Sequence, residues 1–227
     1  MSKILFCNLA WMDYYKGIYP GIDVPEGGGD YVKKTHNAHE KYNFEKVLLD
    51  FSVGPFEPGE YCLGFVETKT THVNQNQLHI EKIDGCELAI DEVQVDDVLV
   101  VFCAKHPIYG FTTIVGWYKH ATIYRYYQTM DFLSNDDNDD VYTQYYNIIA
   151  KSEDCVLLPR SERSKKAKWE VPRRNTGASF GFGQSNIWFA TNKDENQLLE
   201  SYLNRIVKQI NEYYGENWLD KYPETGC

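Results

Sequence analysis

Residues 98–125 read V-L-V-V-F-C-A-K-H-P-I-Y-G-F-T-T-I-V-G-W-Y-K-H-A-T-I-Y-R, and the expected fold is built around this stretch. It opens with five apolar residues of high strand propensity, Val98 to Phe102, and a second apolar run follows from Thr112 to Trp117. Short apolar runs bounded by turn residues are typical of buried strands. Because His106-Pro107 and Gly110 lie between the two runs, the stretch predicts a central β-hairpin.

The second half of this hairpin ends in a cluster of aromatic and basic side chains: Trp117, Tyr118, Lys119, Tyr124 and Arg125. Gly116 precedes the cluster, and a glycine inside a strand often marks a bulge or a close approach of another backbone. We therefore expect the hairpin to bring aromatic rings and cations together on a rigid scaffold.

The composition is that of a globular protein. The chain has 227 residues, of which 43% are apolar and 15% aromatic, enough for a single domain over residues 1–227 with a sizeable core. No apolar run approaches 18 residues, and residues 1–12 lack the features of a signal peptide, so we expect no membrane span and a cytoplasmic location. The six cysteines lack zinc or CxxC spacing and are expected to be buried thiols.

Charge is unevenly distributed. The net charge of −10 argues against indiscriminate binding to polyanions. Residues 160–174, however, hold seven Lys or Arg residues and two Glu, a local net charge of +5. A basic segment in an acidic chain is suited to a localised contact with phosphate groups.

The remaining elements follow from local patterns. Strands are expected at Lys3 to Leu9, Tyr61 to Glu67, Leu78 to Ile83 and Cys155 to Leu158, whereas Val141 to Ile149 fits either a strand or a helix. Asp96-Asp97 resemble turn residues before the central strand. An amphipathic C-terminal helix is expected at about 195–214, with Gly215 as its C-cap and an apolar face formed by Leu198, Leu199, Tyr202, Leu203, Ile206, Val207, Ile210, Tyr213 and Tyr214.

Catalytic patterns are weak in this sequence. There is no GxSxG elbow, and the H-N-A-H-E run at 36–40 lacks the HExxH spacing of a zinc site, so we expect neither a metal nor another cofactor. A metal-dependent nuclease remains an alternative, with Asp96 or Asp97 as ligands and Lys105 nearby.

A binding site of aromatic, amide and cationic side chains is better supported. Aromatic residues stack on bases, amides read base edges, and cations contact phosphates. The expected base pocket contains Trp11, Tyr14, Tyr31, Asn43, Trp117, Tyr118, Gln184, Ser185, Asn186 and Trp188. The expected phosphate contacts are Lys119, Arg125, Arg160, Arg163, Arg173 and Arg174. The alternative is that many of these aromatic residues belong to the core.

Several motifs resemble a bacterial module that is found in some proteins ahead of an HNH nuclease domain. They are W-M-D-Y-Y-K-G, G-G-G-D-Y-V, H-E-K-Y-N-F, V-G-W-Y-K-H-A-T-I-Y-R, L-L-P and V-P-R-R followed by G-Q-S-N-I-W-F-A. The strand layout is also similar, more remotely, to the PUA-like group with its EVE, YTH and ASCH domains. The resemblance implies an α+β fold in which a mixed β-barrel over about 3–190 is flanked by helices. It also implies an aromatic pocket for a modified or flipped base.

The sequence thus predicts a non-catalytic nucleic-acid-binding module, with DNA expected ahead of RNA as its ligand. No HNH motif follows the resembling region, so we expect any cleavage in a restriction or defence system to come from a separate nuclease subunit. The third alternative is a protein-interaction subunit whose acidic faces contact a basic partner.

Overall fold

The computed structural model describes residues 3–27, 38–50, 56–68, 77–133, 141–191 and 196–224. The strands are β1 (Lys3–Leu9), β2 (Lys46–Leu49), β3 (Gly59–Gly64), β4 (Gln94–Lys105), β5 (Thr112–Leu133), β6 (Val141–Lys151), β7 (Cys155–Leu157) and β8 (Ile187–Trp188). The α-helices are α2 (Arg160–Arg163), α3 (Lys166–Trp169) and α4 (Gln197–Asn211). Short 3₁₀ turns are η1 (His39–Tyr42), η2 (Ile80–Lys82), η3 (Ser152–Asp154), η4 (Arg174–Thr176) and η6 (Trp218–Asp220).

One large sheet organises these elements. Its hydrogen-bonded order is β2-β3-β6-β5-β4-β1-β8, and β7 pairs with β5 outside this path. Only the β1–β4 pairing is parallel among the strand pairs of the described ranges. The fold is therefore α+β, as expected. The closed barrel that the resemblance implied is not formed by the described residues, because the path of paired strands ends at β2 and at β8.

The predicted central hairpin is confirmed by the β4–β5 pairing, in which Val101 lies opposite Trp117 and Phe102 opposite Gly116. The register shifts just beyond this pair, between Phe102 and Cys103, as a bulge requires. A Cβ atom on Gly116 would lie 2.3 Å from the carbonyl oxygen of Val156 and 2.6 Å from the ring of Phe44. Only glycine lets β7 approach β5 this closely.

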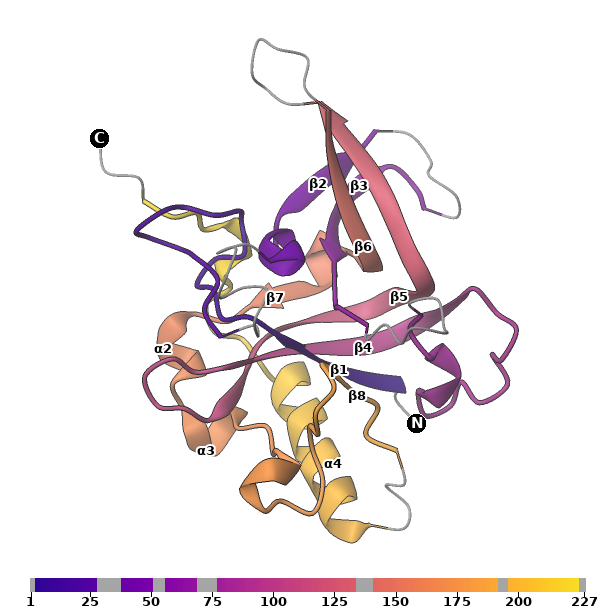
Figure 1. The fold of residues 1–227 in the computed structure, drawn as a ribbon, viewed down its shortest axis with the longest axis vertical. Helices are drawn as coiled ribbons and strands as arrows, with labels where there is room; N and C mark the ends of the chain where they lie inside the picture. The colour runs from indigo at the N-terminus through magenta and orange to yellow at the C-terminus, as the bar shows by residue number, and fades with distance from the viewer. Residues whose placement is uncertain are drawn as a thin grey trace.

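The central strands are buried on both faces because their side chains alternate between two apolar layers. In β1, Leu5 and Cys7 belong to one cluster, whereas Ile4 and Phe6 belong to the other. The second cluster includes the apolar face of α4, which lies below β1 and β4 with α3 beside it (Figure 1). A third, smaller cluster joins β2, β3 and β6.

The structure corrects several expectations. Leu78 to Ile83 does not form a strand, since it contains η2. Residues 141–149, for which the sequence allowed either a strand or a helix, belong to strand β6. Asp96-Asp97 do not precede the strand but lie within β4 at a bulge, where Asp97 has a φ of 59°. The predicted C-terminal helix is confirmed, but it ends at Asn211 rather than near Gly215, and Glu212 is its C-cap.

Other expectations concern exposure. Leu198 and Tyr214 are expected on the apolar face of the C-terminal helix, but both are exposed, and Tyr214 lies beyond the end of α4. The five cysteines in the described ranges are buried free thiols, as expected, and Cys227 lies outside those ranges. Among the described helices, none is both long and apolar enough to cross a membrane.

Candidate ligand-binding cleft

A cleft of about 940 Å³ lies where the carboxyl ends of β1 and β4 meet. Because these strands are parallel, Leu9 lies beside Ala104, and the cleft begins at this shared edge. The turn after β4 and the chain from α3 to η4 form its sides, together with two residues of α4. Its lining includes Asn8, Glu26, Lys105, Tyr109, Phe111, Thr112, Lys166, Glu170, Arg173, Tyr202 and Arg205.

An aromatic stack stands at one side of the cleft and is centred on the buried His106. Its ring centroid lies 4.7 Å from that of Trp11, 4.7 Å from Tyr109 and 5.7 Å from Phe111. His106 Nδ1 accepts backbone hydrogen bonds from Ile108 and Tyr109, so Nε2 carries the proton and donates to Ser164 Oγ at 3.0 Å. Burial, with the nearby positive charges of Arg160 and Arg163, lowers the His106 pKa. The neutral ring thus supports the exposed Tyr109 and the half-buried Phe111.

Arg173 occupies the floor of the cleft. Its Nε donates to Thr112 Oγ1 and its Nη2 donates to Asn8 Oδ1, while the guanidinium lies 5.3 Å from the ring centroid of Phe182. The backbone is held as well, because Val171 N–H donates to the Thr112 carbonyl. Burial lowers the Arg173 pKa. Among the described residues, no carboxylate forms an ion pair with this guanidinium.

Three further cations surround this floor: Lys105, Lys166 and Arg205, all exposed. Lys166 forms an ion pair with Glu170 at 3.5 Å, and Arg205 donates to the Lys168 carbonyl at 3.0 Å. With Arg173, four cations face the two carboxylates that line the cleft, Glu26 and Glu170. The cleft is therefore positively charged in a chain of net charge −10.

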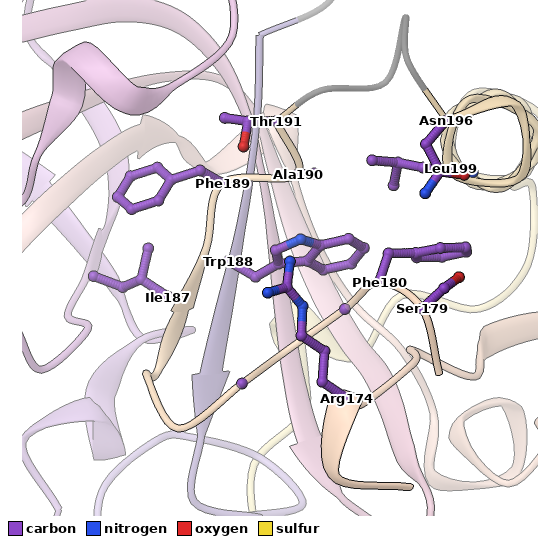
Figure 2. A pocket seen from close by; sticks show the side chains of 12 residues that line it. Arg174, Ser179, Phe180, Ile187, Trp188, Phe189, Ala190, Thr191, Asn196 and Leu199 are labelled. Atoms are coloured by element: carbon purple, nitrogen blue, oxygen red, sulfur yellow. Dashed lines mark hydrogen bonds between the residues drawn. The ribbon is translucent and has the colours of Figure 1, made fainter. Parts of the chain in front are cut away.

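A second cavity of about 510 Å³ lies between β8 and α4. Figure 2 shows the Trp188 and Phe180 rings next to each other in its wall, and their centroids are 6.2 Å apart. Arg174 lines this cavity, whereas Arg173 lines the larger cleft. Arg173 and Arg174 are consecutive in the chain but line two different cavities.

The structure does not bring the predicted aromatic residues into one pocket. Trp11 and Tyr118 lie in one apolar cluster, whereas Trp117 and Trp188 lie in the other. Trp11, Trp117, Tyr118 and Trp188 are each less than a tenth exposed. Trp117 and Tyr118 are consecutive on β5 and point to opposite faces, and both faces are covered by apolar clusters. Tyr14 is half-buried and stacks on Trp218, with ring centroids 5.3 Å apart. Tyr31 and His36 lie outside the described residues.

The predicted amides have different positions. Asn43 is buried and exchanges two 2.9 Å hydrogen bonds with the backbone of Phe65, so it joins two chain segments instead of reading a base edge. Gln184 and Ser185 are exposed. The Asn186 carbonyl accepts a 2.7 Å hydrogen bond from the Asn8 N–H, which places this segment beside the end of β1.

Two of the predicted phosphate contacts are structural. Arg125 is 7% exposed, and its guanidinium donates to the Glu81 carboxylate and to the carbonyls of Ala89, Ile90 and Glu92. Arg163 is fully buried and donates to the carbonyls of Met12, Asp13 and Leu158.

Of the other predicted cations, Arg160 is exposed and forms an ion pair with Asp13 at 3.4 Å. Lys119 lies on β5, half-buried and away from both cavities. Arg173 and Arg174 are therefore the two predicted phosphate contacts that line a cavity.

The cleft also contains residues that were not predicted to bind a nucleotide: Asn8, Tyr109, Phe111, Lys166 and Arg205. Lys105 lines it as well, although the sequence suggested Lys105 only for the alternative nuclease site. The turn at His106 to Gly110 was recognised, and an exposed aromatic residue in a turn is a signal that could have identified Tyr109. Asn8 interrupts an apolar strand, which is a second usable signal.

The residues expected to form the site of a metal-dependent nuclease do not come together either. Asp97 and Lys105 lie eight residues apart on one extended strand, a separation of roughly 25 Å. Asp96 accepts a hydrogen bond from Thr122, and Asp97 pairs with His120 at 2.7 Å. No group of three or more His, Cys, Asp or Glu suited to a metal ion occurs in the described part of the chain.

Comparison of the chain with protein-family models, with curated proteins and with solved structures finds no match. The function proposed below therefore rests on the geometry and charge of the cleft.

Proposed function

We propose that this protein is a PUA-like nucleic-acid-binding module that reads a modified or extruded base, with the nucleotide held in the cleft at the carboxyl ends of β1 and β4. The observation that carries the proposal is a hydrogen-bonded guanidinium on the floor of a positively charged cleft that an exposed aromatic side chain also lines. In this proposal the protein recognises DNA, and a separate nuclease subunit supplies any cleavage.

Each part of the cleft has a role in binding a nucleotide. Tyr109 is 62% exposed and stacks loosely on Phe111, so its ring offers a face to a base. Stacking of one base on an aromatic side chain contributes about 1–3 kcal/mol. Lys105, Lys166 and Arg205 lie where phosphates on either side of that base would pass. A local contact of this kind also explains how a chain of net charge −10 can bind a polyanion.

The test is a titration of labelled single-stranded and duplex oligonucleotides, with and without modified bases, at two salt concentrations. Tyr109→Ala should weaken binding about 5- to 150-fold, the equivalent of one stacked base. Tyr214→Ala is the matched control, because Tyr214 is 92% exposed and lies outside the cleft. The proposal fails when no oligonucleotide binds, or when both variants bind like the unchanged protein.

A second function is favoured by a separate surface. Leu88, Ile90 and Val93 are 97%, 66% and 62% exposed, although Arg125 holds their segment rigid through three carbonyl hydrogen bonds. Residues 84–97 contain six carboxylates and no Lys or Arg. An ordered apolar surface with this charge would suit a basic protein partner.

A synthetic helical peptide with leucines on one face and lysines on the other tests this second function. Binding should be lost in Leu88→Asp and kept in Leu48→Asp, whose leucine is 71% exposed on β2. Equal binding by the two variants, or no binding by the unchanged protein, would exclude the surface as a docking site.

A further inference from the structure

The orientation of Arg173 limits which bases the cleft can accept. A guanidinium has five N–H donors in one plane. Nε–H and one hydrogen of Nη2 lie along the same edge of the guanidinium, and this edge is engaged by Thr112 Oγ1 and Asn8 Oδ1. The opposite edge, formed by Nη1 and the second hydrogen of Nη2, has no hydrogen-bond partner within the described ranges.

The free edge is also fixed in position. Phe182 lies under the guanidinium at 5.3 Å, and its backbone bonds to both neighbours of Arg173: its N–H donates to the Pro172 carbonyl, and its carbonyl accepts from Arg174 N–H. Side chain and backbone are therefore both held before a ligand arrives. Such preorganisation favours a ligand whose acceptors match the fork geometry.

The neighbouring groups add donors to this floor. Because Asn8 Oδ1 faces Arg173, the Asn8 amide nitrogen points to the other side of the side chain and is available to donate. Thr112 Oγ1 is already an acceptor for Arg173. Of the two carboxylates in the lining, Glu170 is paired with Lys166 and Glu26 is exposed, and neither forms an ion pair with Arg173 within the described ranges. The floor therefore presents hydrogen-bond donors to whatever enters.

We propose that this floor selects a base that has two adjacent hydrogen-bond acceptors, namely cytosine through O2 and N3 or guanine through O6 and N7. Adenine places an amino donor beside N1 and N7, and thymine has an N–H between its two carbonyls, so each offers the Arg173 edge one acceptor only. An extruded base exposes all of these edges to a pocket. This inference rests on the proposed nucleotide binding, and it makes Arg173 a base reader instead of a phosphate contact.

The probes are labelled nine-nucleotide thymidine strands with a single central cytosine, guanine, adenine or thymine. The strands with cytosine or guanine should bind about tenfold more tightly than the other two, since a bidentate contact contributes about 1–3 kcal/mol of discrimination. Arg173→Lys keeps the charge but removes the fork, so the four strands should bind alike. Arg160→Lys is the matched control, because Arg160 pairs with Asp13 and lies outside both cavities.

Two results would overturn the inference in different ways. Equal affinities of the unchanged protein for all four strands would leave nucleotide binding intact and make Arg173 a contact for phosphate. No binding to any strand would overturn the proposed function as well. Because the four-strand comparison on the unchanged protein decides the matter, a folding defect in Arg173→Lys would not obscure the answer.

Discussion

Replacing Arg125 by methionine separates a structural arginine from a ligand-binding one. Methionine keeps much of the apolar stem but removes donors to four acceptors: the carboxylate of Glu81 and the carbonyls of Ala89, Ile90 and Glu92. Each buried acceptor left without a donor costs about 1–3 kcal/mol, and breaking a buried charged pair costs about 3–5 kcal/mol. Because the Glu81 side chain is still 21% exposed, we expect the low end for this pair, and a total loss of at least about 3 kcal/mol.

The assay is urea unfolding followed by circular dichroism, with Arg174→Met as the control for loss of an exposed arginine. The control should change the free energy of unfolding by less than about 0.5 kcal/mol. Below the midpoint of unfolding, Arg125→Met should bind oligonucleotides as the unchanged protein does. An Arg125→Met variant with unaltered stability but lost oligonucleotide affinity would refute the assignment of Arg125 as a structural residue.

The dependence of stability on acidic pH should also report on the Glu81–Arg125 contact. Burial raises the Glu81 pKa, but hydrogen bonds from its own backbone, Arg125 and His79 outweigh that effect and lower it below the ordinary value of 4.5. A lowered carboxyl pKa stabilises the fold above the unfolded-state value, and this stability is lost as the pH falls through the folded-state value. The Arg125→Met variant should therefore lose less stability than the unchanged protein when the pH is lowered through this range.

Two other predictions concern the scaffold. Gly116→Ala should destabilise the fold by about 1–3 kcal/mol or more, since its Cβ would overlap the Val156 carbonyl and force β7 away; thermal unfolding measures this, and an unchanged melting temperature would contradict it. The pKa of His106 lies below 6.5, so the unfolded chain binds a proton that the folded protein excludes, and stability should fall as the pH drops below about 6.5. His106→Gln should reduce that slope in urea titrations at pH 5–7, and an identical slope would show that His106 does not cause it.

Local patterns were sufficient to predict much of the scaffold. The β4–β5 hairpin and β1 were identified from apolar runs, and α4 from its 3.6-residue period, because each pattern reflects which face of the element is buried. The 78–83 segment was mistaken for a strand because apolar residues in a 3₁₀ turn and in a short strand look alike. The end of α4 was misplaced because Tyr213 continues the apolar face beyond the helix and packs on Trp117.

The site could be predicted only in part, because exposure depends on tertiary partners. Arg125 and Arg173 are both predicted phosphate contacts, yet one donates to carbonyls of a preceding loop and the other lies on the floor of a cleft. Trp117 looked like a stacking residue but packs between Trp169 and Tyr213. Asn8, Tyr109 and Arg205 belong to one cleft although about a hundred residues separate each from the next, so no local pattern links them.

Mapping the bound oligonucleotide by ¹⁵N NMR tests the central claim most directly. On titration with the single-stranded probe that carries a central cytosine, we predict shift changes at the Asn8 side-chain amide, the Tyr109 backbone amide and Arg173 Nε. The amides of Leu88 and Ile90 should not move, because their surface lies outside the cleft. Changes confined to 88–93, or none in the cleft at saturation, would contradict the assignment of this cleft as the nucleotide site.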